Sequence, residues 1–318
     1  MSGTKILVSG IQPSGQLHIG NYFGAMKQVI ELQDKYESYF SIVNYHALTS
    51  VRDKEQLSKD TMSAAMDYLA AGIDPKKVTL FVQADVPHVT ELAWIFNTLI
   101  TVPYLSRAVA YKDKTAQGLE ATVGLFDYPV LMASDILIFD AEIVPVGADQ
   151  KQHVEMARDI AQKFNQAYGE TFTLPQVRIQ ESVATVPGID GRKMSKSYGN
   201  TIPLFASRDE LSKQVMSIVT DSSGARPEHV YAIHKLFKSE AELQELYDAN
   251  VGNYKALKET LIEDIDAFIA PFRARRDELA EDESYVKKIL AASGEKMRGK
   301  AEKKMKDVRK KAGIVTTY

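Results

Sequence analysis

The order of short apolar segments and longer amphipathic segments limits most strongly what this chain can fold into. Up to about residue 195 the two kinds alternate, a βα pattern that predicts a parallel sheet covered by helices. The predicted strands are Lys5–Ile11, Tyr39–Leu48, Val78–Gln83, Glu142–Gly147 and Gln176–Ile179. The predicted helices between them are Asn21–Tyr36, Lys54–Gly72, His88–Thr101, Leu105–Asp113, Ala121–Phe139 and Asp149–Tyr168.

After Pro203 the strand pattern ends, and apolar residues recur at helical spacing. Ser207-Arg-Asp-Glu210 has the sequence of a capping box, which supports a helix start there. The helices predicted in this part are Ser207–Asp221, Pro227–Phe237, Glu240–Asn250, Tyr254–Glu281 and Ser284–Lys311. We therefore expect an α/β protein with a Rossmann-like parallel-sheet domain over residues 1–202 and an α-helical C-terminal domain over residues 203–318.

Composition excludes several classes of protein. The 318 residues are 45% hydrophobic and 25% charged, as in an ordinary globular protein. Leu/Ile/Val stretches are interrupted by Lys, Asp or Gln, so no segment is expected to span a bilayer. The first residues lead into a predicted strand and lack the apolar core of a signal peptide. The chain has no cysteine, hence no disulfide or thiolate metal site. We expect a cytoplasmic protein without membrane contacts.

Charge is unevenly distributed along the chain. The net charge is only −3, which argues against nonspecific nucleic-acid binding by the whole surface. Residues 295–311 carry nine Lys/Arg against three Asp/Glu, a local charge of +6 that leaves −9 for the remainder. A basic stripe on an acidic body suits one defined polyanion. A solvated helix end has the same composition, so this segment alone does not decide between the two.

The segment Pro13-Ser-Gly-Gln-Leu-His-Ile-Gly-Asn21 lies between the first predicted strand and the first predicted helix. A glycine-bearing turn at a helix N-terminus is an anion site, because free backbone N–H groups and the helix dipole point at the ligand. The overlapping Gly10-Ile-Gln-Pro-Ser-Gly15 has the glycine spacing of a P-loop, but Gln16-Leu17 replaces the required Lys-Ser/Thr. Cations for a bound phosphate must therefore come from elsewhere in the chain.

A second segment, Lys193-Met-Ser-Lys-Ser197, supplies two lysines flanked by hydroxyl groups. Either segment alone is weak evidence, since Lys/Ser loops are usually solvated turns. Together and in this order, they resemble the two signature motifs of the class I aminoacyl-tRNA synthetases. The first motif of that family is written His-Ile-Gly-His, and Asn21 at the place of its last histidine is typical of the tryptophanyl branch. The resemblance covers nearly all of residues 4–225 and is weaker in the C-terminal helices.

The resemblance implies a ligase that joins tryptophan to tRNA(Trp). The L-tryptophan carboxylate would attack the α-phosphorus of ATP and expel pyrophosphate, and the tRNA terminal adenosine would then take the aminoacyl group. No protein nucleophile takes part, so catalysis consists of positioning and of stabilising charge on the phosphoryl oxygens. Mg²⁺ is expected to be bound through ATP, without a metal site of the protein itself. The resemblance also implies a homodimer.

ATP is expected to lie between the two signature segments. The residues implied in catalysis are Lys193, Lys196, Ser195, His18 and Gln12. The residues implied in ATP binding are Gln12, Pro13, Ser14, Gly20, Asn21, Gly147, Ala148, Asp149, Val186, Lys193, Met194, Ser195, Lys196 and Ser197. The two lysines would contact the pyrophosphate, and backbone N–H groups of the first segment would do much of the binding. His18 would donate to a phosphate, and the alternative is a structural role. For Asp149 an ordinary helix N-cap is compatible with a role in ATP binding.

An indole needs a flat apolar pocket with one acceptor for its N–H group. Tyr128, Met132, Asp135 and Ile136 fall three or four residues apart on one face of a predicted helix, which places a carboxylate within an apolar stripe. The resemblance implies that Asp135 accepts the indole N–H; an Asp bonded to nearby backbone or to an arginine is the alternative. The set implied in tryptophan binding is Asp135, Val8, Gly10, His46, Tyr128, Met132, Ile136, Val144, Val146 and Gln150.

Two departures from the family pattern concern this pocket. Familiar bacterial members have a phenylalanine at the place of Val8, and Asp-Gln-His at the place of Asn44-Tyr45-His46. Both change the expected shape of the pocket and leave its expected location in place. Outside the pocket, the basic helix Lys296–Lys311 is expected to contact the tRNA backbone, and the helical domain is expected to read unstacked anticodon bases.

Three other functions fit part of the pattern. A tyrosyl enzyme shares both signature motifs, but typically has Gly-Ser-Asp-Gln where this chain has Gly147-Ala-Asp-Gln150. A nucleotide-binding module without ligase activity has no need of Lys193, Lys196 or Asp135. A nucleotidyltransferase for a small metabolite shares the first motif, but the long helical C-terminal part with a basic end speaks against it.

Overall fold

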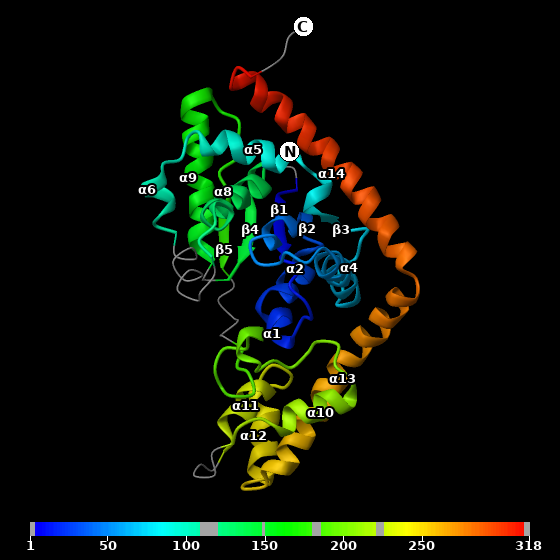
Figure 1. The fold of residues 1–318 in the computed structure, drawn as a ribbon. Helices are drawn as coiled ribbons and strands as arrows, with labels where there is room; N and C mark the ends of the chain where they lie inside the picture. Colours follow the sequence, from blue (N-terminus) through cyan, green and yellow to red (C-terminus); the bar gives the residue numbers. More distant parts are fainter. Residues whose placement is uncertain (1–3, 109–119, 148–149, 180–185, 221–225, 315–318) are drawn as a thin grey trace.

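The computed structural model describes residues 4–108, 120–147, 150–179, 186–220 and 226–314 (Figure 1). Its centre is a parallel sheet with the order β3-β2-β1-β4-β5. The strands are β1 (Ile6–Ile11), β2 (Glu37–Ile42), β3 (Val78–Val82), β4 (Ile143–Val146) and β5 (Gln176–Ile179). The order reverses between β1 and β4, where open α/β sheets bind their ligands. The predicted Rossmann-like α/β fold is confirmed.

Helices connect the strands and cover both faces of the sheet. Those before residue 200 are α1 (Ile19–Asn21), α2 (Lys27–Leu32), α3 (Asn44–Ala47), α4 (Lys54–Ala70), α5 (His88–Asn97), α6 (Val102–Leu105), α8 (Val123–Leu137) and α9 (Lys151–Tyr168). The described residues also form the π-helical turn η1 (Tyr22–Met26) and the 3₁₀ turns η2 (Gln83–Asp85) and η4 (Lys196–Tyr198).

The structure corrects three of the predicted elements. The strand predicted over Tyr39–Leu48 ends at Ile42, because residues 44–47 form α3. The single helix predicted over Asn21–Tyr36 is interrupted by the π-helical turn η1. In place of the helix predicted over Leu105–Asp113, the described residues show α6, whose Pro103 in the first turn favours a helix start; residues 109–113 lie outside the described part.

Alternate residues of the strands face two different apolar clusters. Tyr39 and Phe81 pack with α5, α8 and α9 on one face of the sheet. Phe40 and Leu80 pack with α4 and with apolar residues of η1 on the other. These two clusters hold the carboxyl ends of β1 and β4 in fixed positions.

The C-terminal helices are α10 (Arg208–Met216), α11 (Glu228–His234), α12 (Glu240–Ala249), α13 (Tyr254–Glu281) and α14 (Glu283–Lys311). The first four gather at one end of the molecule, and α14 returns along the sheet-containing part (Figure 1). Leu261 and Ile265 of α13 share an apolar cluster with Phe23 of η1, and Met297 of α14 shares the other with Phe81. The predicted boundary between residues 202 and 203 is therefore not a boundary between separate apolar cores.

The basic stripe of α14 faces the acidic body of its own chain. Lys300 pairs with Glu37 at 3.2 Å, and Lys304 pairs with Asp140 at 2.6 Å. Arg309 donates to Glu91 at 2.7 and 2.6 Å. Much of the positive charge that predicted a polyanion surface is thus used within the fold. Among the described residues, the exposed cations of this stripe that form no ion pair are Lys296, Arg298, Lys303, Lys306 and Lys310. Of these, Lys296 donates to Thr79 Oγ1 and Arg298 donates to the Asp85 carbonyl.

Within the described part of the chain, no helix has both the length and the apolar character needed to cross a bilayer.

Candidate active site

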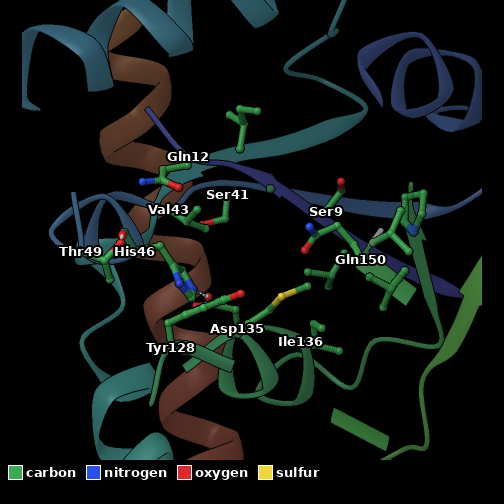
Figure 2. A pocket seen from close by; sticks show the side chains of 17 residues that line it. Ser9, Gln12, Ser41, Val43, His46, Thr49, Tyr128, Asp135, Ile136 and Gln150 are labelled. Atoms are coloured by element: carbon green, nitrogen blue, oxygen red, sulfur yellow. Dashed lines mark hydrogen bonds and ion pairs between the residues drawn. The ribbon is translucent and has the colours of Figure 1, made fainter. Parts of the chain in front are cut away.

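A cavity of about 440 Å³ lies at the point where the strand order reverses (Figure 2). Its walls come from β1 and the residue after it, from β2 and α3, from one face of α8, and from β4 with the residues that follow it. This volume is within the range of small-molecule sites. The cavity therefore lies where the strand order predicts a ligand site, at the carboxyl ends of β1 and β4.

All ten residues that the sequence indicated for tryptophan binding line this one cavity, together with Gln12. Helical spacing brings Tyr128, Met132, Asp135 and Ile136 to one face of α8, as predicted. Six lining residues were not predicted: Ser9, Ile11, Ser41, Val43, Thr49 and Pro145. Three of them, Ser9, Ile11 and Pro145, are sequence neighbours of predicted residues in predicted strands, so adjacency was a signal that could have identified these three.

Asp135 is buried in the cavity wall, with 9% of its surface exposed. His46 Nε2 lies 2.9 Å from its Oδ2, and Gln83 Nε2 donates to Oδ1 at 2.8 Å and to Oδ2 at 2.7 Å. The alternative of a bond to nearby backbone or to an arginine is not what the described residues show. Figure 2 shows the His46 ring and the Asp135 carboxylate pointing toward one another in the cavity. Asp135 thus lies in the apolar wall as a carboxylate held by side-chain donors.

Tyr128 closes the cavity next to this carboxylate. Its hydroxyl lies 2.8 Å from Nε2 of the buried His153 on α9, and its ring meets that of His46 edge-on at 6.0 Å between centroids. Two contacts of different kinds therefore fix the ring as part of the wall.

The strands that form the floor approach each other closely at Gly10. A Cβ atom at this position would lie 2.9 Å from the carbonyl oxygen of Ser41, which explains why the site needs a glycine. The buried Ser41 Oγ has no hydrogen-bond partner among the described residues, so it is an additional polar atom in the cavity wall. Val8, where a phenylalanine was expected from the family pattern, lines the same cavity with a smaller side chain.

The second signature segment contacts the first. Lys196 Nζ donates to the carbonyl oxygens of Ser14 at 2.7 Å and Gly15 at 3.1 Å. Partial burial lowers the pKa of Lys196, against the opposing influence of Asp60 and Asp67. Lys193 lies in an exposed position beside Met194. Residues nearly 200 positions apart thus form one edge of the site.

Met194 anchors this segment from within. It is buried, its backbone N–H donates to the Val186 carbonyl at 2.8 Å, and its Cβ would lie only 3.3 Å from a Cβ at Gly20. Ser195 N donates to Asn200 Oδ1 at 2.8 Å, and the Ser195 and Ser197 hydroxyls are 2.9 Å apart. Asn200 was not predicted, because an asparagine three residues beyond the motif gives no sequence signal of such a contact.

The start of α1 differs from the expected open anion site. The N–H of Ile19 donates to the Ile202 carbonyl at 3.0 Å, and those of Asn21 and Tyr22 donate to the His18 carbonyl at 2.8 and 3.3 Å. The Asn21 side chain accepts from the His18 N–H at 3.0 Å. The Asn21 N–H, one of those expected to bind phosphate, is therefore paired within the protein, and binding by the other backbone groups of this segment stays a prediction.

His18 is a buried side chain of this segment that has an unused polar atom. It is buried, and its Nδ1 has no hydrogen-bond partner among the described residues. Burial, with a smaller contribution from the positive charge of Lys196, lowers the pKa of His18 from 6.5 to about 4. The ring is therefore neutral at physiological pH, and can donate one hydrogen bond without carrying a charge.

The remaining predicted residues lie around these two edges. Gln12 lines the cavity and donates to Ser50 Oγ at 3.2 Å, and Gly147 follows directly after β4. Pro13 is buried and Ser14 is exposed. Ala148 and Asp149 lie outside the described residues. In the described part of the chain, no three His, Asp or Glu side chains are grouped so that they could hold a metal ion.

Comparison with known proteins relates this geometry to a family. The family described as class I tRNA synthetases for tryptophan and tyrosine matches residues 2–303. A tryptophan–tRNA ligase from Fusobacterium nucleatum is 47% identical, covering 98% of each chain, and one from Rhodopirellula baltica is 45% identical, covering 97% of this chain and 99% of that one. A crystal structure of tryptophanyl-tRNA synthetase from Campylobacter jejuni, complexed with ADP and tryptophan, is 47% identical with a TM-score of 0.91, covering 97% and 99%. This chain belongs to the tryptophanyl-tRNA synthetase family of class I aminoacyl-tRNA synthetases.

Proposed function

We propose that the cavity at the carboxyl ends of β1 and β4 is the site where this tryptophan–tRNA ligase activates its amino acid. A tryptophan carboxylate oxygen forms a bond to the α-phosphorus of ATP, and the bond from that phosphorus to the bridging oxygen of pyrophosphate breaks. The terminal adenosine of tRNA(Trp) then attacks the acyl carbon of the adenylate, and AMP leaves. The observation that carries the proposal is the single buried carboxylate, Asp135, in an otherwise largely apolar wall.

Asp135 is proposed to accept the indole N–H. The carboxylate oxygens already accept from His46 and Gln83, and each has two lone pairs, so capacity for a further donor remains. The surrounding Tyr128, Met132 and Ile136 supply apolar contacts for the ring. An amino acid without an N–H at this position leaves a buried acceptor without its partner, which costs binding free energy. Gln150, at the other side of the cavity, is proposed to bind the amino group.

ATP is proposed to bind between the two signature segments. Lys196 contacts backbone carbonyls of the first segment, so its ammonium group lies where a phosphate would pass. The neutral His18 ring is proposed to donate to a phosphate oxygen through a ring N–H group. Lys193, Ser195 and Ser197 would supply further donors as negative charge grows on the leaving group. Mg²⁺ is proposed to be bound by the phosphate oxygens of ATP.

The helical part is proposed to bind tRNA, with anticodon bases read at α10–α13. The exposed Lys303, Lys306 and Lys310 of α14 remain available for phosphates, whereas its paired cations do not. Kinship with tryptophan–tRNA ligases also supports a cytoplasmic homodimer as the working form.

The test is ATP–pyrophosphate exchange with each of the amino acids. Exchange is expected with tryptophan, and exchange with tyrosine alone would overturn the substrate assignment, since the family includes both specificities. Asp135→Ala should raise the KM for tryptophan by about 10- to 100-fold, the range for loss of a hydrogen bond to a charged group. An unchanged KM would show that Asp135 does not contribute to tryptophan binding. Aminoacylation of purified tRNA(Trp) tests the second step.

A further inference from the structure

Gln83 lies behind the cavity wall, in the turn η2 that follows β3. It is 1% exposed and is not among the residues that line the cavity. Its sequence position, at the end of a predicted strand, gave no indication of a contact with Asp135, which is 52 residues away. Through this contact Gln83 reaches the carboxylate without touching the substrate.

The two ends of the Gln83 amide have different partners. Oε1 accepts from the backbone N–H of Tyr45 at 2.9 Å, and Nε2 donates to both oxygens of Asp135 at 2.8 and 2.7 Å. A backbone N–H can only donate, so it fixes the amide oxygen on its own side and leaves the NH₂ group facing Asp135. The amide is therefore held in one orientation by the backbone.

The element that holds Gln83 also carries the second partner of Asp135. Asn44 Oδ1 accepts from the backbone N–H of Ala84 at 3.1 Å, so α3 and η2 are joined by side chain–backbone bonds in both directions. His46 of α3 contacts Asp135 Oδ2 at 2.9 Å. Asn44 and Tyr45 are the positions that differ from the usual family pattern; Asn44 takes part through its side chain and Tyr45 through its backbone N–H.

We propose that Gln83 is a positioning residue that sets specificity for the indole N–H. A contact to both carboxylate oxygens fixes the plane of the carboxylate, so that Asp135 presents an acceptor to the cavity in one geometry. Without this donor, the carboxylate can rotate and bind water, which weakens the hydrogen bond that distinguishes indole from rings lacking N–H. The proposal rests on the proposed role of Asp135 and concerns binding, so the chemical step is not expected to depend on Gln83.

The test compares tryptophan with β-(benzothiophen-3-yl)alanine, in which sulfur replaces the indole N–H. In Gln83→Met the KM for tryptophan in pyrophosphate exchange should rise about tenfold, the effect expected for one hydrogen bond to a charged group. The KM for the benzothiophene analogue and both kcat values should change by less than about twofold. The preference for tryptophan over the analogue therefore falls by about the same tenfold factor.

Gln33→Met is the matched control. Gln33 also bridges two backbone groups, donating to the Gly72 carbonyl at 3.4 Å and accepting from the Asp74 N–H at 3.0 Å, but it lies outside the cavity. Its replacement should leave the preference for tryptophan unchanged. If Gln83→Met raises the KM for tryptophan and for the benzothiophene analogue by the same factor, Gln83 only supports the fold and the proposal is overturned.

Gln83→Glu keeps the shape and provides a second readout if the methionine variant does not fold. The new carboxyl group can donate to Asp135 only when it is protonated. The KM of this variant for tryptophan, relative to wild type, should therefore decrease as the pH is lowered from about 8 to about 6. A ratio independent of pH contradicts the donor role. An Asp135→Ala variant with unchanged tryptophan KM would instead contradict the proposed function itself, which separates the two failures.

Discussion

Lys196 Nζ donates to the carbonyl oxygen of Ser14 at 2.7 Å, across 182 residues of sequence. The ammonium group that we propose for the phosphates is thus held by backbone carbonyls of the first signature segment. Phosphate oxygens carry more negative charge than carbonyl oxygens, so ATP should displace these contacts as it binds. Binding of ATP at this edge therefore requires the Lys196 ammonium group to exchange carbonyl contacts for phosphate contacts.

Lys196→Ala should lower the rate of adenylate formation by about 10²- to 10³-fold, the range for removal of one donor to transition-state charge. Tryptophan affinity should change little, because the partner charge of Lys196 develops on the leaving group. Single-turnover adenylate formation and tryptophan titration measure the two quantities. Lys213→Ala, a lysine on α10, is the control and should leave both unchanged. Equal losses in rate and affinity would contradict the role.

The lowered pKa of His18 makes stability depend on pH. The folded protein takes up this proton near pH 4, whereas the unfolded chain takes it up near pH 6.5, so the free energy of unfolding should fall as pH drops between these values. Above about pH 6.5 the His18 ring is neutral in both the folded and the unfolded state, so it does not contribute to the pH dependence of the free energy of unfolding. Denaturation of wild type and His18→Gln at pH values across this window measures the difference. Identical pH dependences for the two proteins would show that burial of His18 does not disfavour its charged form.

Arg276→Ala should destabilise the protein by about 3–5 kcal/mol, because it leaves a buried carboxylate without its partner. Arg276 of α13 contacts Asp67 of α4 at 2.6 Å, and burial raises the pKa of Asp67 while Arg276 lowers it. Adding Asp67→Asn should restore part of the loss. The neighbouring Arg275, in an exposed pair with Glu278, is the control, with an expected cost below about 1 kcal/mol. If urea denaturation gave the same loss of unfolding free energy for Arg275→Ala as for Arg276→Ala, the stabilising role of the buried pair would be contradicted.

Arg309→Gln should loosen α14 from α5. Hydrogen bonds from Arg309 lower the pKa of Glu91, and both side chains are partly exposed, so the expected cost is only about 1 kcal/mol and should shrink at high salt. Hydrogen exchange should increase in α5 and in the last turns of α14. Lys310→Gln, one residue further along in an exposed position, should leave exchange unchanged. If hydrogen exchange were similar in Arg309→Gln and Lys310→Gln, the pair of Arg309 with Glu91 would not be what holds α14 to α5.

The sequence predicted those parts of the site that depend on local periodicity. Helical spacing brought Asp135 and Met132 to one face of α8. Val144 and Val146 were indicated by the family resemblance, and they line the same cavity together with Pro145 between them. Contacts between distant segments left no such pattern. The bond from Gln83 to Asp135 depends on how β3 lies beside β2 and on where α3 begins, and neither is encoded by spacing in the chain.

At α1 the local pattern predicted the order of elements but not the partners of individual backbone groups. The strand, turn and helix are where the motif predicts them, but α1 is only three residues long and is followed by a π-helical turn. The N–H of Asn21 bonds to His18, and that of Ile19 bonds to the distant Ile202. A motif predicts the order of elements, whereas the partners of its backbone groups are decided by tertiary packing.

Helix α14 lies against β3, the last strand on its side of the sheet, and Lys296 of this helix donates to Thr79 Oγ1 at 2.9 Å. An uncovered terminal strand presents unpaired N–H and C=O groups that can recruit another chain. The final helix therefore protects this protein from edge-to-edge aggregation, so a chain truncated before α14 should precipitate even where its catalytic residues are intact.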